Sequence, residues 1–153
     1  MNMNKKGFTL IELLAVIVIL AIIAVIATPI ITGIIEDAKK NAAMDSAYGV
    51  LNSVQGLYAG SMLTDSTVTL PITVTWTNGT PTTSGGTTNT ITLTGTQPTT
   101  GTVTLSDTGK YCVGTHTPKT DAADETCIGD NFLVVNGYKV TYDFENQKFT
   151  TVE

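Results

Sequence analysis

The chain contains no arginine, one histidine and two cysteines among 153 residues. The missing arginine and the formal charge of -5 argue against a dedicated nucleic-acid site, which usually carries clustered Lys and Arg. His116, in a segment whose composition predicts a loop, leaves too few ligands for a four-coordinate zinc site. Gly109-Lys110 lacks the flanking residues of a phosphate-binding loop. We therefore expect neither an enzyme nor a resident cofactor or metal.

The two cysteines, Cys112 and Cys127, have fourteen residues between them and so lack the C-x-x-C spacing of redox proteins. If this part of the chain lies outside the cytoplasm, a disulfide between them is expected. The alternative is a pair of unpaired, buried thiols.

The N-terminal third contains a long apolar run, with no charged residue from Leu13 to Ile35. A helix needs about 20 apolar residues to cross a bilayer. Lys5 and Lys6 precede the run, which predicts a cytoplasmic N-terminus and an external C-terminal part. Ala27-Thr28-Pro29 is a poor match to the small-residue site that ends an ordinary signal peptide.

Glu12 lies at the start of this apolar run. A carboxylate in a membrane segment costs a few kcal/mol unless it is paired or reaches the interface, so such a residue is a functional candidate. The alternative is that Glu12 lies hydrated at the level of the lipid headgroups.

The residues around Glu12 favour a function. Lys5-Lys6-Gly7-Phe8-Thr9-Leu10-Ile11-Glu12 resembles the processing motif of type IV pilins and related pseudopilins. The resemblance implies that residues 1–7 are a leader, that a membrane peptidase cuts between Gly7 and Phe8, and that the new amine of Phe8 is N-methylated. Pro29 also matches the family. The implied partners are the prepilin peptidase and N-methyltransferase, other pilin subunits, and the inner-membrane pilus assembly machinery. The implied location is the cell membrane before assembly and a surface filament afterwards.

The motif has a physical rationale of its own. Cleavage would create a positive amine at Phe8, and Glu12 follows about 6 Å further along a helix axis. In a staggered helical bundle, the amine of one subunit could meet the carboxylate of its neighbour. Both charges are otherwise poorly solvated, so their pairing would set the register between subunits.

Helical periodicity continues beyond the membrane run. Apolar residues recur at intervals of three or four, or sums of these. They are Ile34, Ile35, Ala38, Ala42, Ala47, Leu51, Val54, Leu57 and Tyr58. We expect a helix over residues 8–60, spanning the membrane at about 10–32 and packing its second half on the rest of the chain. Gly56 and Gly60 mark its expected end. A free amphipathic helix on the membrane surface is disfavoured because basic residues are few.

Residues 61–153 form the expected head domain. Between Thr64 and Thr108 nearly half of the residues are Thr, and apolar and polar residues alternate at 68–70, 72–76, 91–93 and 103–105. Such alternation predicts half-buried strands, with turns at 78–79, 84–86 and 97–98. The alternative is a disordered, glycosylated stalk, and Asn78-Gly79-Thr80 fits a glycosylation acceptor.

The clearest strand signal lies at the end of the chain. Residues 132–135 and 138–144 flank Asn136-Gly137, the preferred type I′ hairpin turn, and residues 148–152 predict a third strand. The fold class we expect is α+β, with a long N-terminal helix packed on an antiparallel sheet.

An acidic segment containing Asp121, Asp124, Glu125 and Asp130 could hold calcium through oxygen ligands, but its spacing matches no dedicated loop. A solvated acidic loop is the favoured interpretation.

Three functions fit these features. The first is a structural pilin serving adhesion, surface motility or aggregation, and the second is a pseudopilin of a type II secretion or DNA-uptake system. The third is a membrane-anchored binding domain that never polymerises. Glu12 and the processing motif argue against the third.

Overall fold

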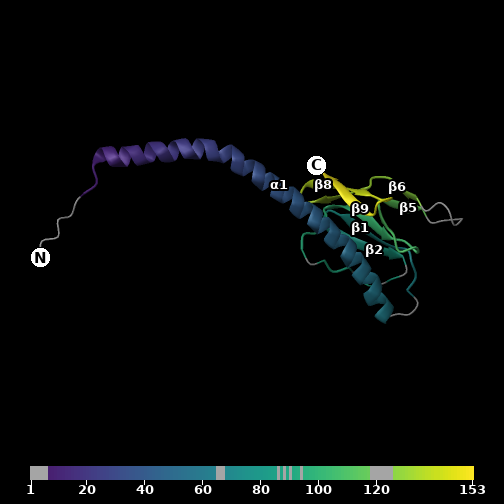
Figure 1. Ribbon diagram of the computed structural model, residues 1–153. Helices are drawn as coiled ribbons and strands as arrows, with labels where there is room; N and C mark the ends of the chain where they lie inside the picture. The colour runs from purple at the N-terminus through teal and green to yellow at the C-terminus, as the bar shows by residue number, and fades with distance from the viewer. Residues whose placement is uncertain are drawn as a thin grey trace, which may run out of the picture. The chain divides into compact units, whose positions relative to one another are not determined.

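The computed structural model describes residues 7–64, 68–85, 87, 89, 91–93, 95–117 and 126–153 (Figure 1). The chain divides into two compact units, Met1–Lys39 and Lys40–Glu153. Helix α1 (Leu10–Thr64) begins in the first unit and ends in the second. The strands follow in the second unit. They are β1 (Ile72–Thr77), β2 (Thr80–Gly85), β3 (Thr100–Leu105), β4 (Tyr111–Val113), β5 (Thr115–Thr117), β6 (Thr126–Ile128), β7 (Phe132–Val135), β8 (Tyr138–Asp143) and β9 (Lys148–Val152).

In the first unit, α1 presents its apolar side chains outward. Every large apolar side chain from Phe8 to Ile35 is exposed. The most apolar 18-residue window of α1 has a mean hydropathy of 3.2, and the helix is long enough to span a bilayer. Such a surface is stable only when lipid or other apolar helices cover it.

The helix continues through Pro29, which has no N–H for the i−4 carbonyl. Neighbouring threonines bond the backbone around it. Thr28 Oγ1 donates to the Ala24 carbonyl at 2.7 Å, and Thr32 Oγ1 donates to the Pro29 carbonyl at 3.0 Å. Both hydroxyls add a donor to a backbone carbonyl, but neither of these bonds reaches the Val25 carbonyl, which is the one that Pro29 leaves without its N–H.

In the second unit, the C-terminal part of α1 packs on one face of an antiparallel sheet (Figure 1). The helix residues in this core are Ala43, Ala47, Val50, Leu51, Val54 and Leu57. They meet buried sheet residues such as Val74, Leu133 and Tyr142. The α+β class is therefore confirmed. The expected apolar stripe was placed too early, because Ile34, Ile35, Ala38 and Ala42 are exposed and burial begins at Ala43. Periodicity shows which side of a helix is apolar but not where its partner begins.

The helix ends at Thr64, beyond the end expected at Gly60. Its last turn has polar partners. Ser61 Oγ donates to the Leu57 carbonyl at 2.7 Å and lies 2.7 Å from Thr87 Oγ1. Asn89 Nδ2 donates to Ser61 Oγ at 3.0 Å. These bonds support the last turn in spite of the preceding glycine, which itself has open space beside it.

The large sheet has the strand order β2-β1-β3-β7-β8-β9, with β4 also paired to β3, and β5 and β6 form a separate two-stranded sheet. The predicted meander of β7, β8 and β9 is confirmed. Asn136 and Gly137 have φ of 54° and 82°, and Asn78 and Gly79 have 52° and 78°. Positive φ at both central residues is the requirement of a type I′ turn, so the predicted hairpin turn at Asn136-Gly137 and the predicted turn at Asn78-Gly79 both form.

Other strand predictions were wrong. Residues 68–70 and 91–93 form no strand, although Val68 and Ile91 are buried in the core. Strands β2, β4, β5 and β6 were not predicted, and His116 lies in β5 rather than in a loop. Alternating apolar residues report burial, and a loop that lies over a core can produce the same pattern as a strand.

We call the part of α1 from Ala43 to Ser61, which packs on the sheet, the stem. One pair of residues fixes the stem to the hairpin of β8 and β9. The Phe149 N–H donates to Tyr48 Oη at 3.1 Å, and the two rings meet edge to face with centroids 5.0 Å apart. The ring of Tyr142 also packs edge to face on Phe149, with the two centroids 5.0 Å apart. The Tyr142 hydroxyl donates to Gln147 Oε1. Burial raises the pKa of Tyr142 above its usual range, so the hydroxyl remains a donor.

Candidate functional site

The predicted cleavage site lies just before α1. Residues 7–9 have no regular secondary structure, and α1 begins at Leu10. Phe8 is 92% exposed, and nothing lies within 4 Å of the position of a Cβ on Gly7. A peptidase must bind the backbone on both sides of the bond it cuts. The Gly7–Phe8 bond is accessible in this way because it lies outside the helix.

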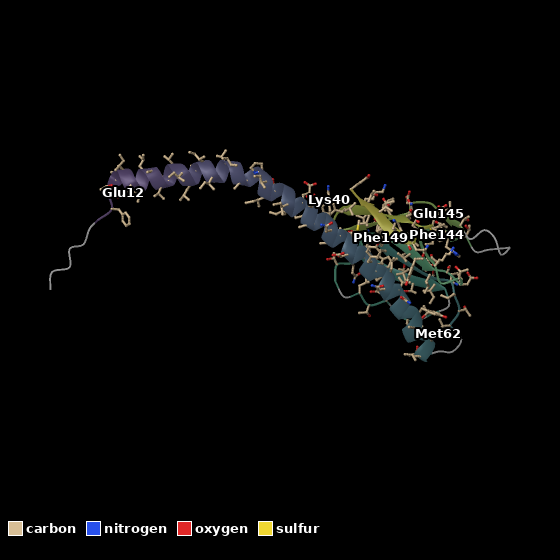
Figure 2. The ribbon with its side chains drawn as sticks, in the orientation of Figure 1. Glu12, Lys40, Met62, Phe144, Glu145 and Phe149 are labelled. Carbon is tan, nitrogen blue, oxygen red and sulfur yellow. A yellow bond between two sulfur atoms is a disulfide. The ribbon has the colours of Figure 1, made fainter. Side chains whose placement is uncertain are left out.

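Thr9 and Glu12 form a reciprocal cap on the first turn of α1, where Figure 2 labels Glu12. The Thr9 N–H donates to Glu12 Oε2 at 2.8 Å, and the Thr9 hydroxyl donates to the same oxygen at 2.7 Å. The Glu12 N–H donates in return to Thr9 Oγ1 at 3.3 Å. This is the capping box of a helix N-terminus. Our sequence analysis missed the role of Thr9, although the Thr-x-x-Glu spacing carries the signal.

The cap fixes where the carboxylate of Glu12 lies. Both of the hydrogen bonds that it accepts use Oε2, and within the described chain no hydrogen bond reaches Oε1. A carboxylate oxygen accepts up to two donors. Glu12 can therefore keep its own helix capped and still accept a charged donor through Oε1. The positive end of the helix dipole also favours an anion here.

Pro29 lies far from this turn along α1, within the exposed apolar part of the helix. The structure thus brings Gly7, Phe8, Thr9 and Glu12 together and leaves Pro29 apart. Any role of Pro29 in assembly is through the shape or packing of the helix, not through the capped turn.

The predicted disulfide is present. Cys112 in β4 is bonded to Cys127 in β6, with a Cα–Cα distance of 5.5 Å. Cys112 is fully buried, and its neighbour across the sheet is Thr104 of β3. The bond therefore ties the small β5–β6 hairpin to the large sheet.

Replacing both cysteines with Ser should lower the stability of the head by about 3 kcal/mol, because the bond closes a loop of about 15 residues in the unfolded chain. Thermal unfolding of the full chain in detergent should show a lower Tm, while membrane insertion is unchanged. Alkylation of the native exported protein is the control. Two reactive thiols in the wild-type chain would contradict the prediction.

The remaining candidates do not assemble into a metal site in the described chain. Asp130 is exposed, whereas Asp121, Asp124 and Glu125 lie outside the described residues. No group of three or more potential metal ligands occurs within the described ranges. Asn78 is exposed at the tip of the β1–β2 hairpin, where a modifying enzyme could reach it.

Residues 2–28 match the family model of the prokaryotic N-terminal methylation motif. No curated protein and no solved structure matched the chain. The motif is the hallmark of prepilin-type proteins, and it implies cleavage by a prepilin peptidase and anchoring in the membrane. The motif, together with a long apolar N-terminal helix and an α+β fold, supports a type IV pilin-like or pseudopilin protein.

Proposed function

We propose that this chain is the structural subunit of a type IV pilus-like filament, which serves adhesion, surface motility or aggregation. The observation that carries the proposal is the placement of Glu12. It is a carboxylate held at the first turn of a helix whose large apolar side chains are all exposed as far as Ile35. A helix meant only to anchor a domain in lipid could be capped equally well by an uncharged Gln, and a carboxylate is costly in lipid.

In this proposal the apolar part of α1 is surrounded first by lipid and later by the helices of other subunits. Before assembly it spans the bilayer, and the head lies outside. After assembly the same surface packs against the helices of neighbouring subunits. Lipid tails and apolar helices solvate such a surface similarly, so the apolar surface alone favours neither state. The preference for the filament then has to come from polar pairing and from close packing.

Glu12 supplies the polar pairing. Cleavage after Gly7 leaves an amine on Phe8, directly before the capped turn. The amine of an incoming subunit would be paired with Oε1 of a neighbour's Glu12, because Oε2 is occupied by Thr9. A charged hydrogen bond in apolar surroundings is stronger than a surface salt bridge, and leaving either partner alone is costly. The pair therefore sets the position of each subunit along the filament.

The head in this proposal supplies the outer surface of the filament. Its sheet covers one side of the stem, and its disulfide ties the β5–β6 hairpin to the large sheet. The contacts between Tyr48 and Phe149 hold the stem to the last hairpin. A head held in this way keeps a fixed position on the C-terminal part of α1.

The first test is the N-terminus of the mature protein. Filaments sheared from cells should contain a chain that lacks Met1 to Gly7 and begins at Phe8 with one added methyl group. Mass spectrometry of the purified filaments measures both features, and electron microscopy establishes that long filaments are present. A mature chain that begins at Thr28 or Pro29 would instead indicate an ordinary secreted protein. A correctly processed chain in cells without long filaments would favour a pseudopilin.

A further inference from the structure

The outward face of three strands carries only hydroxyl side chains. On β1 and β3 the inward positions hold core residues such as Val74, Trp76 and Val103, whereas no residue of β2 is buried. The outward positions are all Thr or Ser. Those exposed to solvent are Thr77 on β1, Thr80, Thr82 and Ser84 on β2, and Thr100 on β3, and those half-buried are Thr73, Thr75 and Thr102. We call these residues the hydroxyl face.

The strand register aligns these side chains in rows across the sheet. Thr75 lies between Thr82 and Thr102, and Thr77 lies between Thr80 and Thr100. Rows repeat about every 7 Å along the strands, and neighbours within a row are about 4.8 Å apart. The face is therefore a regular lattice, and it lies on the side of the sheet away from the stem.

Hydrogen bonds within the lattice hold its side chains in place. Thr75 Oγ1 lies 3.2 Å from Thr102 Oγ1. In the next row, Thr73 Oγ1 lies 2.9 Å from Oγ1 of Thr104, which is on the same side of the sheet but is buried. Thr82 Oγ1 donates to the Thr75 carbonyl at 3.1 Å. Side chains that are already ordered lose little conformational entropy when a partner binds.

The hydroxyl face also carries no charge. No Asp, Glu or Lys occurs between Asp65 and Asp107. The other half of the same sheet differs, since β8 carries Lys139 and Asp143 and β9 begins with Lys148. The side chain of Asn146, and to a lesser extent its backbone N–H, donate hydrogen bonds to Asp143 and hold the pKa of its carboxyl below the usual value. The carboxylate of Asp143 therefore stays charged.

Charge decides where two copies can approach. Loss of Lys5 and Lys6 with the leader would change the formal charge of the chain from -5 to -7. Filaments built from such subunits repel one another, and repulsion is strongest where charged surfaces meet. Asp130 is exposed and lines the same hollow as Thr100 and Thr102, so a carboxylate lies beside the β3 edge of the hydroxyl face. The β1 and β2 part of the face is therefore where two filaments can touch with the fewest like charges between them.

The size of the face limits what it can do. Three strands of six residues cover roughly 300 Å². A stable pair of proteins needs about 800 Å² on each partner, so one such contact would not hold a dimer. A filament presents the face once per subunit, and many weak contacts in parallel add to a strong association.

We propose that the hydroxyl face is the surface through which filaments of this chain associate laterally, with a second copy on the neighbouring filament as its partner. The proposal rests on the proposed filament function. It assigns bundling to the uncharged half of the sheet and leaves the charged half facing solvent.

The test compares Thr82→Lys with Thr150→Lys in filaments of the full chain. Both threonines are exposed strand residues, and both donate Oγ1 to a carbonyl of the neighbouring strand, Thr82 to Thr75 and Thr150 to Thr141. Each variant adds one positive charge per subunit. We expect Thr82→Lys to lower the fraction of filaments that sediment at low speed by about tenfold or more, because the lost contact repeats at every subunit. Thr150→Lys should bundle like the wild type. Electron microscopy should show single filaments for Thr82→Lys at normal yield.

Three results would overturn the proposal while leaving the filament function intact. The two variants could bundle equally, the two could disperse equally, or wild-type filaments could stay single even at high salt. If single wild-type filaments instead sediment with an insoluble neutral polysaccharide and Thr82→Lys filaments do not, the face has a different partner. Complete absence of filaments would overturn the proposed function and this inference with it.

Discussion

Glu12→Gln should leave the chain cleaved and inserted in the membrane but lower filament yield by at least about tenfold. Gln can keep the reciprocal cap with Thr9, because a capping box accepts either Glu or Gln at this position. What it loses is the negative charge. The Phe8 amine of the incoming subunit would then enter the helix bundle unpaired, which costs several kcal/mol. A cost of about 1.4 kcal/mol at each subunit already changes an equilibrium constant tenfold.

Two further variants separate the charge of Glu12 from its capping role. Glu12→Ala removes both and should assemble as poorly as Glu12→Gln. Thr9→Val removes the hydroxyl of the cap, at about 1 kcal/mol of helix stability, but keeps the carboxylate, so it should assemble far better than either. Filament yield is the sheared surface protein relative to the membrane pool. Wild-type yield for Glu12→Gln would show that the carboxylate only caps the helix, and the pairing mechanism would be wrong.

The N-terminal part of the molecule could be predicted because its signals are local in the sequence. A charge-free apolar run of this length predicts a membrane-spanning helix, and a carboxylate at the start of such a run is easily recognised as a candidate functional residue. The Asn-Gly turns were predictable for the same reason, since two residues decide the backbone geometry. The disulfide was expected only from the inferred location of the head outside the cytoplasm.

The path of the Thr-rich part could not be predicted so well. Thr favours strands but is tolerated in loops, so nearly uniform Thr content gives no boundaries. Ile91 is buried although its segment forms no strand. Conversely, β2 has mostly exposed residues and still pairs with β1 along its whole length. Which strands lie side by side depends on contacts between distant residues. The rows of the hydroxyl face depend on which strands are neighbours and on their register, so the sequence alone does not predict them.

Val54→Asp should unfold the head. Val54 is fully buried on the stem part of α1, within the core that the helix shares with the sheet. An aspartate there would be a buried charge without a partner, or would have to bind a proton and still leave polar atoms unsatisfied. Either way the cost is several kcal/mol, a large share of the 5–15 kcal/mol that stabilises a typical domain. The expected result is a head that proteases digest rapidly at temperatures where the wild-type head resists them.

Asn52→Asp is the matched control, because it introduces the same side chain two positions earlier on the same helix. Position 52 is exposed, so the new carboxylate stays hydrated and the free energy of unfolding of the head should stay within about 0.5 kcal/mol of the wild-type value. Both variants keep the whole of α1 as far as Ile35 unchanged and should insert in the membrane equally. Limited proteolysis of the full chains in detergent, followed over a temperature series, measures the difference. Equal resistance of the two variants would show that this part of α1 does not share a core with the sheet, and the long helix would then be an anchor whose length beyond the membrane has no role in folding the head.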